Sequence, residues 1–379
     1  MKELDIFVEI IDNYGDIGVI YRLAKEIFNK KNGKIKIRVF INQTEELVKI
    51  SEKAQNIDVQ NINGIEYITW KYLKNSSITP SNVIIEAFGC KIPEDFLQQA
   101  LVTSSLLINL EYFSCEEWTA SFHGQESLID SKQLKKFFFI PSLLKGTGGV
   151  ICGSKESENI KQLSLNDYIP HLTEEFLLNK NIGTIFSYEK NFSALLEELE
   201  KQKKETILLI MDKLSQESFN LIFDKNKYKK TSIYMFPFVS QEEYDQILKL
   251  TDFNFVRGED SFVRALLSGI PFIWHCYFQE DELHLEKIKS FLKSFKEYFS
   301  MEHSGKYLEE LNILSEIFIL YNNRKENSLE LPKENYQNFF NSLTKLRVIS
   351  KIYKEHLLLN CNLVNNLFFF IEDKLSKTK

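Results

Sequence analysis

Residues 4–28 read LDIFVEIIDNYGDIGVIYRLAKEIF, and this stretch decides the fold class. Residues 4–10 form a short apolar run rich in β-favouring side chains, which predicts a strand. Two glycines then interrupt the pattern. Over residues 17–28 the apolar side chains recur at helical spacing, which predicts a helix with one buried face. A strand that passes through a turn into a helix is the unit from which α/β sheets are built.

The same alternation of strand and helix occurs twice along the chain. Further strands of the first series are expected at 35–41, 83–88 and 106–112, with a helix at 94–102. The pattern lapses around 159–178, which contains Pro170 and is expected to be a linker. The second series has strands at 183–188, 206–211, 232–236, 253–256 and 271–276, with helices at 191–202, 241–250 and 260–268. From residue 280 the sequence is mostly helical, with helices expected at 282–298, 304–321 and 343–375.

Apolar strands joined by helices predict parallel sheets that are covered on both faces. We therefore expect an α/β protein of two doubly wound, Rossmann-like domains, 1–165 and 180–350, that face each other across a cleft. A helical tail at 351–379 follows and is a candidate to pack back on the first domain. Ligands of such sheets bind beyond the carboxyl ends of the strands, so the site is expected in the cleft. Many nucleotide-sugar enzymes and some binding proteins share this architecture.

The composition is that of an ordinary folded protein with an excess of acid. Of 379 residues, 44% are hydrophobic and 26% are charged, and the formal net charge is −6. The acid excess argues against broad binding of nucleic acid or anionic membranes. Five dispersed cysteines without a CxxC pair indicate neither a disulfide framework nor a zinc site. Since the sequence shows neither an apolar signal-peptide core nor an apolar run of membrane-spanning length, we expect a cytoplasmic protein with reduced thiols.

An acidic turn, DNYGDIG at residues 12–18, follows the first predicted strand. Asp12 and Asp16 place two carboxylates where ligands approach such a sheet. The alternative is structural, because Asp16 can cap the helix N-terminus and Asp12 can stabilise the turn. Because no GxGxxG motif follows the strand, a loop that binds the pyrophosphate of a dinucleotide is not expected at this turn. An acidic turn repels phosphate, so it suits a cationic or hydroxyl-bearing acceptor.

A second combination of strand, turn and helix start reads FVRGEDSFVRA at residues 255–265. Unpaired backbone N–H groups and the helix dipole favour an anion at such a helix N-terminus. Ser261 can add a hydroxyl donor, and Arg257 can neutralise a phosphate. The alternative is capping by Asp260 or Ser261 together with a structural arginine. In the adjacent segment WHCYFQEDE, residues 274–282, we expect His275 to be a core residue.

Other polar segments carry weaker signals. Residues 111–118 read EYFSCEEW, and the run KGTGG at 145–149 either cradles a phosphate or lets chain segments approach closely. Cys115 with His123 would offer a thiol nucleophile, but a buried cysteine without a catalytic role is the expectation. Neither HxH nor HExxH occurs, and no DxD stands at a predicted strand end, so a metal is not implied.

Five segments together resemble a known family. In chain order they are DIFVEIIDNYGDIGVIYRLAKEI, LEYFSCEEWTASFHG, FFFIPSLLKGTGG, FSYE and FNFVRGEDSFVRALLSGIPFIWHCYFQEDELH. The chain from residue 4 to residue 292 is similar to the bacterial elongation factor P arginine rhamnosyltransferases, the EarP family. Ile20 and Tyr21 stand where the family pattern has Cys and Trp, and CYF at 276–278 replaces Ile-Tyr-Pro.

The resemblance implies an inverting glycosyltransferase of the GT-B fold. It would move L-rhamnose from dTDP-β-L-rhamnose to one arginine side chain of elongation factor P. The first domain would bind the protein acceptor, and the second domain would bind the nucleotide sugar. By the same resemblance Asp12 and Asp16 are catalytic, with Asp16 as the general base, and Asn13 and Gly15 support this acceptor loop.

The donor site implied by the resemblance lies in the second domain. The positions that match diphosphate and ribose contacts are Arg257, Glu259, Asp260 and Ser261. Phe238 would lie near the thymine base, and Tyr188 and Gln241 match further donor-site positions. No cofactor is implied besides the donor substrate, and neither a membrane nor nucleic acid is an expected partner.

Two other functions stay open at this level. A sugar-nucleotide 2-epimerase of the same fold would need its acid and base beside the donor and would not need a protein acceptor. A non-catalytic two-domain binding protein would hold a ligand without consuming it.

Overall fold

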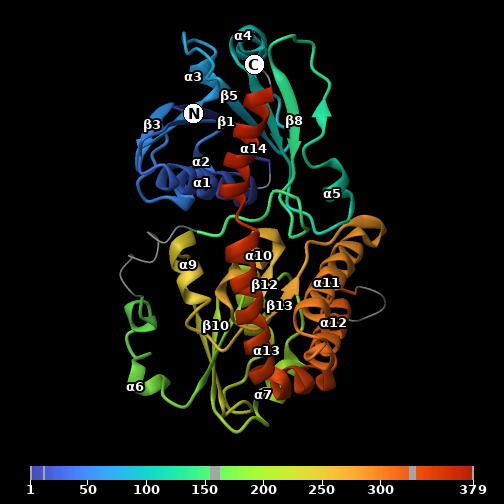
Figure 1. Cartoon of the computed structure of the whole chain (residues 1–379). Helices are drawn as coiled ribbons and strands as arrows, with labels where there is room; N and C mark the ends of the chain where they lie inside the picture. Colours follow the sequence, from blue (N-terminus) through green and yellow to red (C-terminus); the bar gives the residue numbers. More distant parts are fainter. Residues whose placement is uncertain (1, 12, 154–162, 324–329, 378–379) are drawn as a thin grey trace. The chain divides into compact units, whose positions relative to one another are not determined.

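The computed structural model describes residues 2–11, 13–153, 163–323 and 330–377, with residues 13, 14 and 280 described by their backbone alone. The chain forms two compact units (Figure 1). Unit 1 comprises Met1–Ile160 and Leu357–Lys379, and unit 2 comprises Lys161–His356.

Unit 1 is built on an eight-stranded sheet with the strand order β3-β4-β2-β1-β5-β6-β8-β7. Its strands are β1 (Glu3–Val8), β2 (Lys36–Ile41), β3 (Val59–Ile62), β4 (Ile65–Thr69), β5 (Val83–Ala87), β6 (Leu106–Leu110), β7 (Glu126–Ser127) and β8 (Lys135–Phe139). Its helices are α1 (Asn13–Lys30), α2 (Glu45–Ile50), α3 (Trp70–Leu73), α4 (Glu94–Thr103), α5 (Trp118–Phe122) and α14 (Leu363–Lys377). Neighbouring strands are parallel except at the edges, where β3–β4 and β7–β8 are antiparallel.

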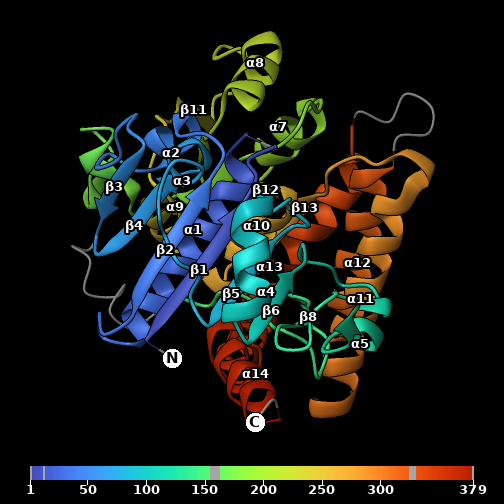
Figure 2. The ribbon, with the colours of Figure 1, turned by 90° about the horizontal axis from the view of Figure 1, so that it is seen from above.

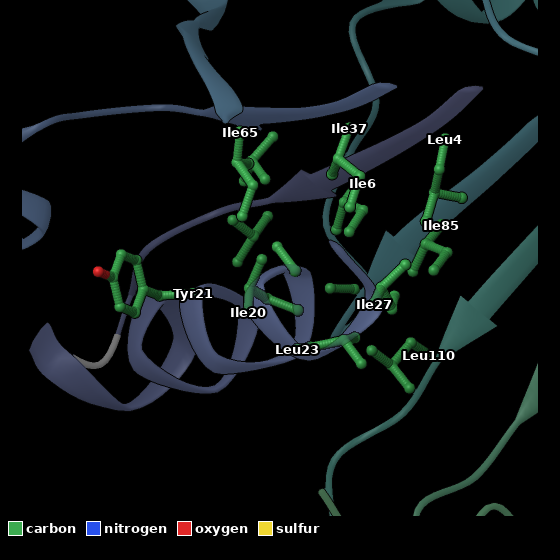
Figure 3. Close-up of a cluster of buried hydrophobic side chains, with 14 of the residues drawn as sticks. Leu4, Ile6, Ile20, Tyr21, Leu23, Ile27, Ile37, Ile65, Ile85 and Leu110 are labelled. Carbon is green, nitrogen blue, oxygen red and sulfur yellow. The ribbon is translucent and has the colours of Figure 1, made fainter. Parts of the chain in front are cut away.

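Two cores cover the two faces of this sheet. Side chains of β1 and its neighbours on one face pack with the apolar sides of α1 and α14, whereas Phe7 joins a second core with Phe96 of α4 on the other face. Figure 3 shows Leu4, Ile6, Ile37 and Ile85 of the strands beside Ile20, Leu23 and Ile27 of α1. Figure 2 shows α1 running along β1 and β2. Because both faces are covered, the central strands are apolar on both sides.

The C-terminal segment contradicts the single helix expected at 343–375. It forms two helices, α13 (Lys333–Asn360) and α14, separated at Cys361 and Asn362. The break has a tertiary cause: the Val150 N–H donates to the Cys361 carbonyl at 2.7 Å, and the Leu363 N–H donates to the Val150 carbonyl at 2.8 Å. These bonds replace helical ones. As a result α14 lies beside α1 in unit 1 (Figure 1).

Unit 2 is built on a five-stranded parallel sheet with the strand order β11-β10-β9-β12-β13. Its strands are β9 (Asn181–Ile185), β10 (Thr206–Ile210), β11 (Thr231–Met235), β12 (Phe253–Arg257) and β13 (Phe272–His275). Its helices are α6 (Glu174–Leu177), α7 (Ser193–Leu199), α8 (Lys213–Ile222), α9 (Gln241–Ile247), α10 (Gly258–Ser268), α11 (Leu283–Glu302), α12 (Leu308–Asn322) and the part of α13 up to His356. Short 3₁₀ helices occupy Leu165–Asp167 and Glu280–Glu282.

The expected alternation of strand and helix is present in both units, but some elements differ from the expectation. The antiparallel edge strands β3 and β7 and the helices α2 and α8 were not anticipated by the pattern. The expected linker at 159–178 lies partly outside the described residues, and its described part contains α6. In the described part of the chain, none of the helices has the length and apolar content needed to cross a membrane.

Candidate functional site

The acidic turn of unit 1 positions one carboxylate very firmly. Asp16 lies in the first turn of α1, and its side chain turns back toward the end of β1. Its Oδ2 accepts a hydrogen bond of 2.9 Å from the Ile11 N–H, and its Oδ1 accepts one of 2.9 Å from the Tyr112 hydroxyl. Only 1% of Asp16 is exposed. A buried carboxylate held by two donors keeps its direction and attracts a cation more strongly than one in water.

Of the other residues predicted for this turn, the structure describes Asn13 and Gly15 but not Asp12. Because α1 begins at Asn13, Asp16 is not the helix N-cap that the structural alternative expected. Asp12 lies outside the described residues. Asn13 and Gly15 both belong to the first turn of α1, and the side chain of Asn13 is not among those described.

Tyr112 is a further residue of this site, for which the sequence pattern predicts no role. It follows β6, and its ring stacks on Phe88 at a centroid distance of 4.3 Å. Tyr112 is 52% exposed, whereas its partner Asp16 is buried. Tyr112 could have been predicted from its place in the sequence, because the residues that follow β6 and those that follow β1 lie at the same carboxyl edge of one parallel sheet.

Two more carboxylates lie near the carboxyl ends of the strands in unit 1. Glu111 accepts a hydrogen bond of 2.9 Å from Asn109, and burial, together with the charge of Glu86, raises the pKa of the Glu111 carboxyl. Glu86 is itself paired with Lys136, whose Nζ lies 2.9 Å from Oε1. Since Lys136 compensates Glu86, the acidic character of this edge comes from Glu111 and Asp16, which fits the expectation of a cationic or hydroxyl-bearing acceptor.

Other candidates of unit 1 have structural roles. His123 accepts a hydrogen bond of 3.0 Å from the Ile140 N–H through Nδ1 and packs on Phe139, and Cys115 is buried. In the glycine run, a Cβ at Gly148 would meet the Ile140 carbonyl oxygen at 2.7 Å, and a Cβ at Gly149 would meet the Cys361 carbonyl oxygen at 2.3 Å. The run therefore allows close approach of chain segments, the structural alternative stated for it.

Arg257 is the central cation at the carboxyl edge of the sheet in unit 2. It ends β12, and its guanidinium lies over the rings of Phe186 and Tyr188, with Cζ 4.6 and 4.9 Å from the ring centroids. Its Nη1 pairs with Oδ2 of Asp212 at 3.2 Å. The side chain thus reaches from β12 across the end of β9 to the residue that caps α8. Contact with two aromatic rings and an ion pair together fix the direction of the guanidinium.

The turn after Arg257 needs a glycine. Gly258 has φ +68°, a conformation that side chains disfavour, and its carbonyl accepts a hydrogen bond of 2.8 Å from Nε1 of Trp274. This bond ties the start of α10 to β13. Since α10 begins at Gly258, Asp260 and Ser261 lie inside its first turn, and neither is the N-cap of the structural alternative.

The first turn of α10 carries two carboxylates, each of which has a cationic neighbour. Oε1 of Glu259 lies 2.7 Å from Nζ of Lys287 on α11. Asp260 lies 3.9 Å from the guanidinium of Arg264 one turn further along α10. The predicted donor residues Arg257, Glu259, Asp260 and Ser261 therefore gather at one strand end and one helix start.

The remaining predicted donor residues share the same edge of the sheet. Tyr188 follows β9 and contacts Arg257, as well as the ring of His275 at 5.1 Å. His275 is buried and its Nδ1 lies 2.9 Å from Ser187 Oγ, as expected for a core histidine. Phe238 and Gln241 follow β11, and Phe238 is 70% exposed. The buried Oε1 of Gln241 has no hydrogen-bond partner among the described residues.

Three further residues contact this edge without having been predicted from the sequence: Asp212, Phe186 and Lys287. Phe186 directly follows β9 and Asp212 lies two residues after the end of β10, so their position could have suggested them. Lys287 lies on a helix far along the chain, and no local signal marks it. Within the described residues, no three His, Cys, Asp or Glu side chains come together as metal ligands would.

Comparison with known proteins decides the family. The model of the elongation factor P rhamnosyltransferase family EarP matches residues 4–372. The chain belongs to the EarP family. The match extends well beyond the residues that carried the resemblance and includes α13 and most of α14.

A known relative agrees with this membership, and solved structures agree with the fold. The chain is 32% identical over 313 residues to the protein-arginine rhamnosyltransferase of Pseudomonas aeruginosa, a match that covers 78% of this EarP-family chain and 82% of that relative. A solved structure on EarP-mediated arginine glycosylation of translation elongation factor EF-P has a TM-score of 0.59 at 18% identity, with 98% of this chain and 99% of that one covered. A UDP-glucosyltransferase of Polygonum tinctorium has a TM-score of 0.52 at 7% identity, covering 100% and 98%. The expected fold class, two Rossmann-like α/β domains of GT-B-like type with a helical C-terminal region, is confirmed.

Proposed function

We propose that this chain transfers L-rhamnose from dTDP-β-L-rhamnose to an arginine side chain of elongation factor P, with inversion at C1 of the sugar. The observation that carries the proposal is the family match over residues 4–372. The Pseudomonas relative is named for arginine as the acceptor and rhamnose as the sugar. The choice of donor and the inversion rest on the sequence resemblance.

The difficult step is attack by a guanidinium, whose pKa above about 12 keeps it protonated and poorly nucleophilic. Prior deprotonation by a carboxylate of ordinary pKa would cost roughly 12 kcal/mol. We therefore infer that proton loss accompanies attack. The N–C1 bond forms, the bond from C1 to the diphosphate oxygen breaks, Asp16 accepts the proton and Asp12 orients the guanidinium. The two hydrogen bonds that fix Asp16 support this role.

The leaving dTDP is assigned to the carboxyl edge of the sheet in unit 2. The diphosphate would be held, and the charge that develops on it stabilised, by the Arg257 guanidinium, the Ser261 hydroxyl and the backbone N–H groups of the helix terminus at Asp260. Glu259 is assigned to hydroxyl groups of the ribose or the rhamnose, because a carboxylate repels phosphate. Phe238 would contact the thymine base, and the further donor contacts of the proposal are Tyr188 and Gln241.

The proposal includes no metal and no other cofactor, since Arg257 and the helix start supply the positive charge that the leaving group requires. It places the reaction in the cytoplasm, with a translation factor as acceptor and with neither membrane nor nucleic acid as partner. Transfer is therefore expected to persist in excess EDTA. If EDTA abolished transfer and added Mg²⁺ restored it, the proposal that the reaction needs no metal would be contradicted.

The test is to incubate the purified protein with elongation factor P and dTDP-β-L-rhamnose and to measure the intact mass of the acceptor. One added deoxyhexose on an arginine, with the anomeric configuration opposite to that of the donor by NMR, is the expected result. Donor consumption without elongation factor P would indicate an epimerase, and binding without consumption would indicate a binding protein. Either result would overturn the proposal.

Asp16→Asn separates the catalytic role from donor binding. The amide keeps the shape and one acceptor oxygen but cannot take the proton, so transfer should be abolished. Affinity for dTDP should stay within about twofold of the wild-type value, since the proposed role of Asp16 concerns the acceptor. A large loss of dTDP affinity would instead assign Asp16 to the donor.

A further inference from the structure

The first turn of α10 presents an electrostatic conflict that the proposed donor site must resolve. Arg257 and the backbone N–H groups of this turn favour an anion, but Glu259 places a carboxylate in the same turn. The Glu259 side chain is 36% exposed, so solvent screens its charge only in part. An uncompensated carboxylate at this point would oppose the binding of a nucleoside diphosphate.

Lys287 supplies the compensating charge. It lies on α11, and its Nζ is 2.7 Å from Oε1 of Glu259. Its side chain is only 12% exposed, so this ion pair is better shielded from solvent than most ion pairs on a protein surface. A Lys side chain that is so enclosed is fixed by its partner, and it fixes that partner in turn.

The pair lies close enough to the carboxyl edge of the sheet for its charges to act on a residue there. Cys276 directly follows β13, and burial raises the pKa of its thiol to about 12, with a further increase from the charge of Glu259 and a decrease from that of Lys287. Both charges therefore act at the end of β13. The end of β12, where Arg257 lies, is its neighbour in the sheet.

We propose that Lys287 is a positioning residue of the donor site: it neutralises Glu259 and holds its carboxylate, so that the start of α10 can accept a nucleoside diphosphate. This inference rests on the proposed function, which assigns dTDP to unit 2. Donor affinity would then depend on Lys287 of α11 as well as on the residues of the turn between β12 and α10.

The chain contains a matched control on the same helix. Lys289 also pairs with a glutamate, Glu286, at an Nζ–Oε1 distance of 2.6 Å, but the side chains are 52% and 60% exposed and the partner belongs to α11 itself. Lys287→Met and Lys289→Met thus remove the same charge from positions two residues apart. Only the first leaves a carboxylate uncompensated at the start of α10.

The experiment is a calorimetric titration of the full-length protein with dTDP at low and at moderate ionic strength. Lys287→Met should weaken dTDP affinity about tenfold at low salt, whereas Lys289→Met should stay within about twofold of wild type. In a Glu259→Gln background, Lys287→Met should have little further effect, because the charge it compensates is gone. With elongation factor P and the dTDP-sugar, KM for the donor should rise more than kcat falls.

Lys287→Arg keeps the charge and should bind dTDP within about threefold of wild type, which tests the inference even where the Met variant does not fold. Equal dTDP affinity of Lys287→Met and wild type, or an equal loss in the presence and absence of Glu259, would overturn the role of Lys287. If wild type binds dTDP and Arg257→Ala does not, the donor site itself is supported. Either of these two results for Lys287→Met would then reject only the role of Lys287. Failure of wild type to bind dTDP would reject the donor assignment and this inference together.

Discussion

The hydroxyl of Tyr112 donates a hydrogen bond of 2.9 Å to Oδ1 of Asp16. The bond joins the segment after β6 to the first turn of α1, across 96 positions of the sequence. Tyr112 is the solvent-accessible member of the pair, and Asp16 is the buried one. The direction of the proposed catalytic carboxylate therefore depends on a residue from a different strand.

Tyr112→Phe is expected to lower kcat for transfer to elongation factor P about tenfold, because a hydrogen bond to a charged group contributes roughly 1.5–3 kcal/mol and also orients it. Affinity for dTDP should not change. Steady-state transfer assays and dTDP titrations check both values. Tyr72→Phe is the control, since Tyr72 is a similarly exposed tyrosine of unit 1. Wild-type kcat in Tyr112→Phe would show that Asp16 needs no support from Tyr112.

Arg257→Lys keeps the charge but removes the planar group that lies over Phe186 and Tyr188. A lysine can neither stack in this way nor form paired hydrogen bonds to phosphate, so dTDP affinity should fall at least about tenfold. Calorimetric titration measures the change. The matched control is Arg347→Lys, because Arg347 pairs with Asp252 at the opposite, amino end of β12 at 2.7 Å. Equal affinities of Arg257→Lys and wild type would mean that charge alone suffices at position 257.

The central parts of the fold could be predicted because local signals and tertiary packing agree there. The apolar runs of β1 and β12 are buried on both faces, and each is followed by a helix, after a short turn for β1 and immediately for β12. The hairpin of β3 and β4 was not predicted, although the dipeptide Asn63-Gly64 is typical of a hairpin turn. In the structure these two residues have φ of +53° and +89°, the left-handed values that such a turn requires. Its strands are short, and β3 alternates exposed and buried residues instead of being apolar throughout.

The site residues were predictable where they lie at the carboxyl end of a strand, as Arg257 does at the end of β12. They were not predictable where a contact depends on distant segments. Lys287 reaches Glu259 from α11, and the break after Asn360 exists because Val150 pairs with the backbone there. Such contacts are set by the packing of elements, and no local pattern of the sequence encodes them.

Glu111 provides a test by pH. Burial is the main cause that raises the pKa of its carboxyl above 4.5, so the folded protein binds this proton more tightly than the unfolded chain does. The stabilising effect of this group is therefore complete below about pH 4.5 and is lost as pH rises through the folded-state pKa. Glu111→Gln keeps an acceptor for Asn109 and does not titrate. The difference in unfolding free energy, wild type minus Glu111→Gln, should decrease from pH 4.5 to pH 7. An increase over this range would contradict the direction of the shift.

Gly183 in β9 provides a test of packing in unit 2. A Cβ at this position would lie 2.2 Å from the ring of Phe253, its buried neighbour on β12. Gly183→Ala should therefore destabilise the protein by about 1–3 kcal/mol or more, as measured by urea unfolding. Phe253→Leu removes the ring atoms that clash, so the double variant should be more stable than the sum of the two single effects predicts. Strict additivity of the two changes would show that the strand accommodates the alanine without contact to Phe253.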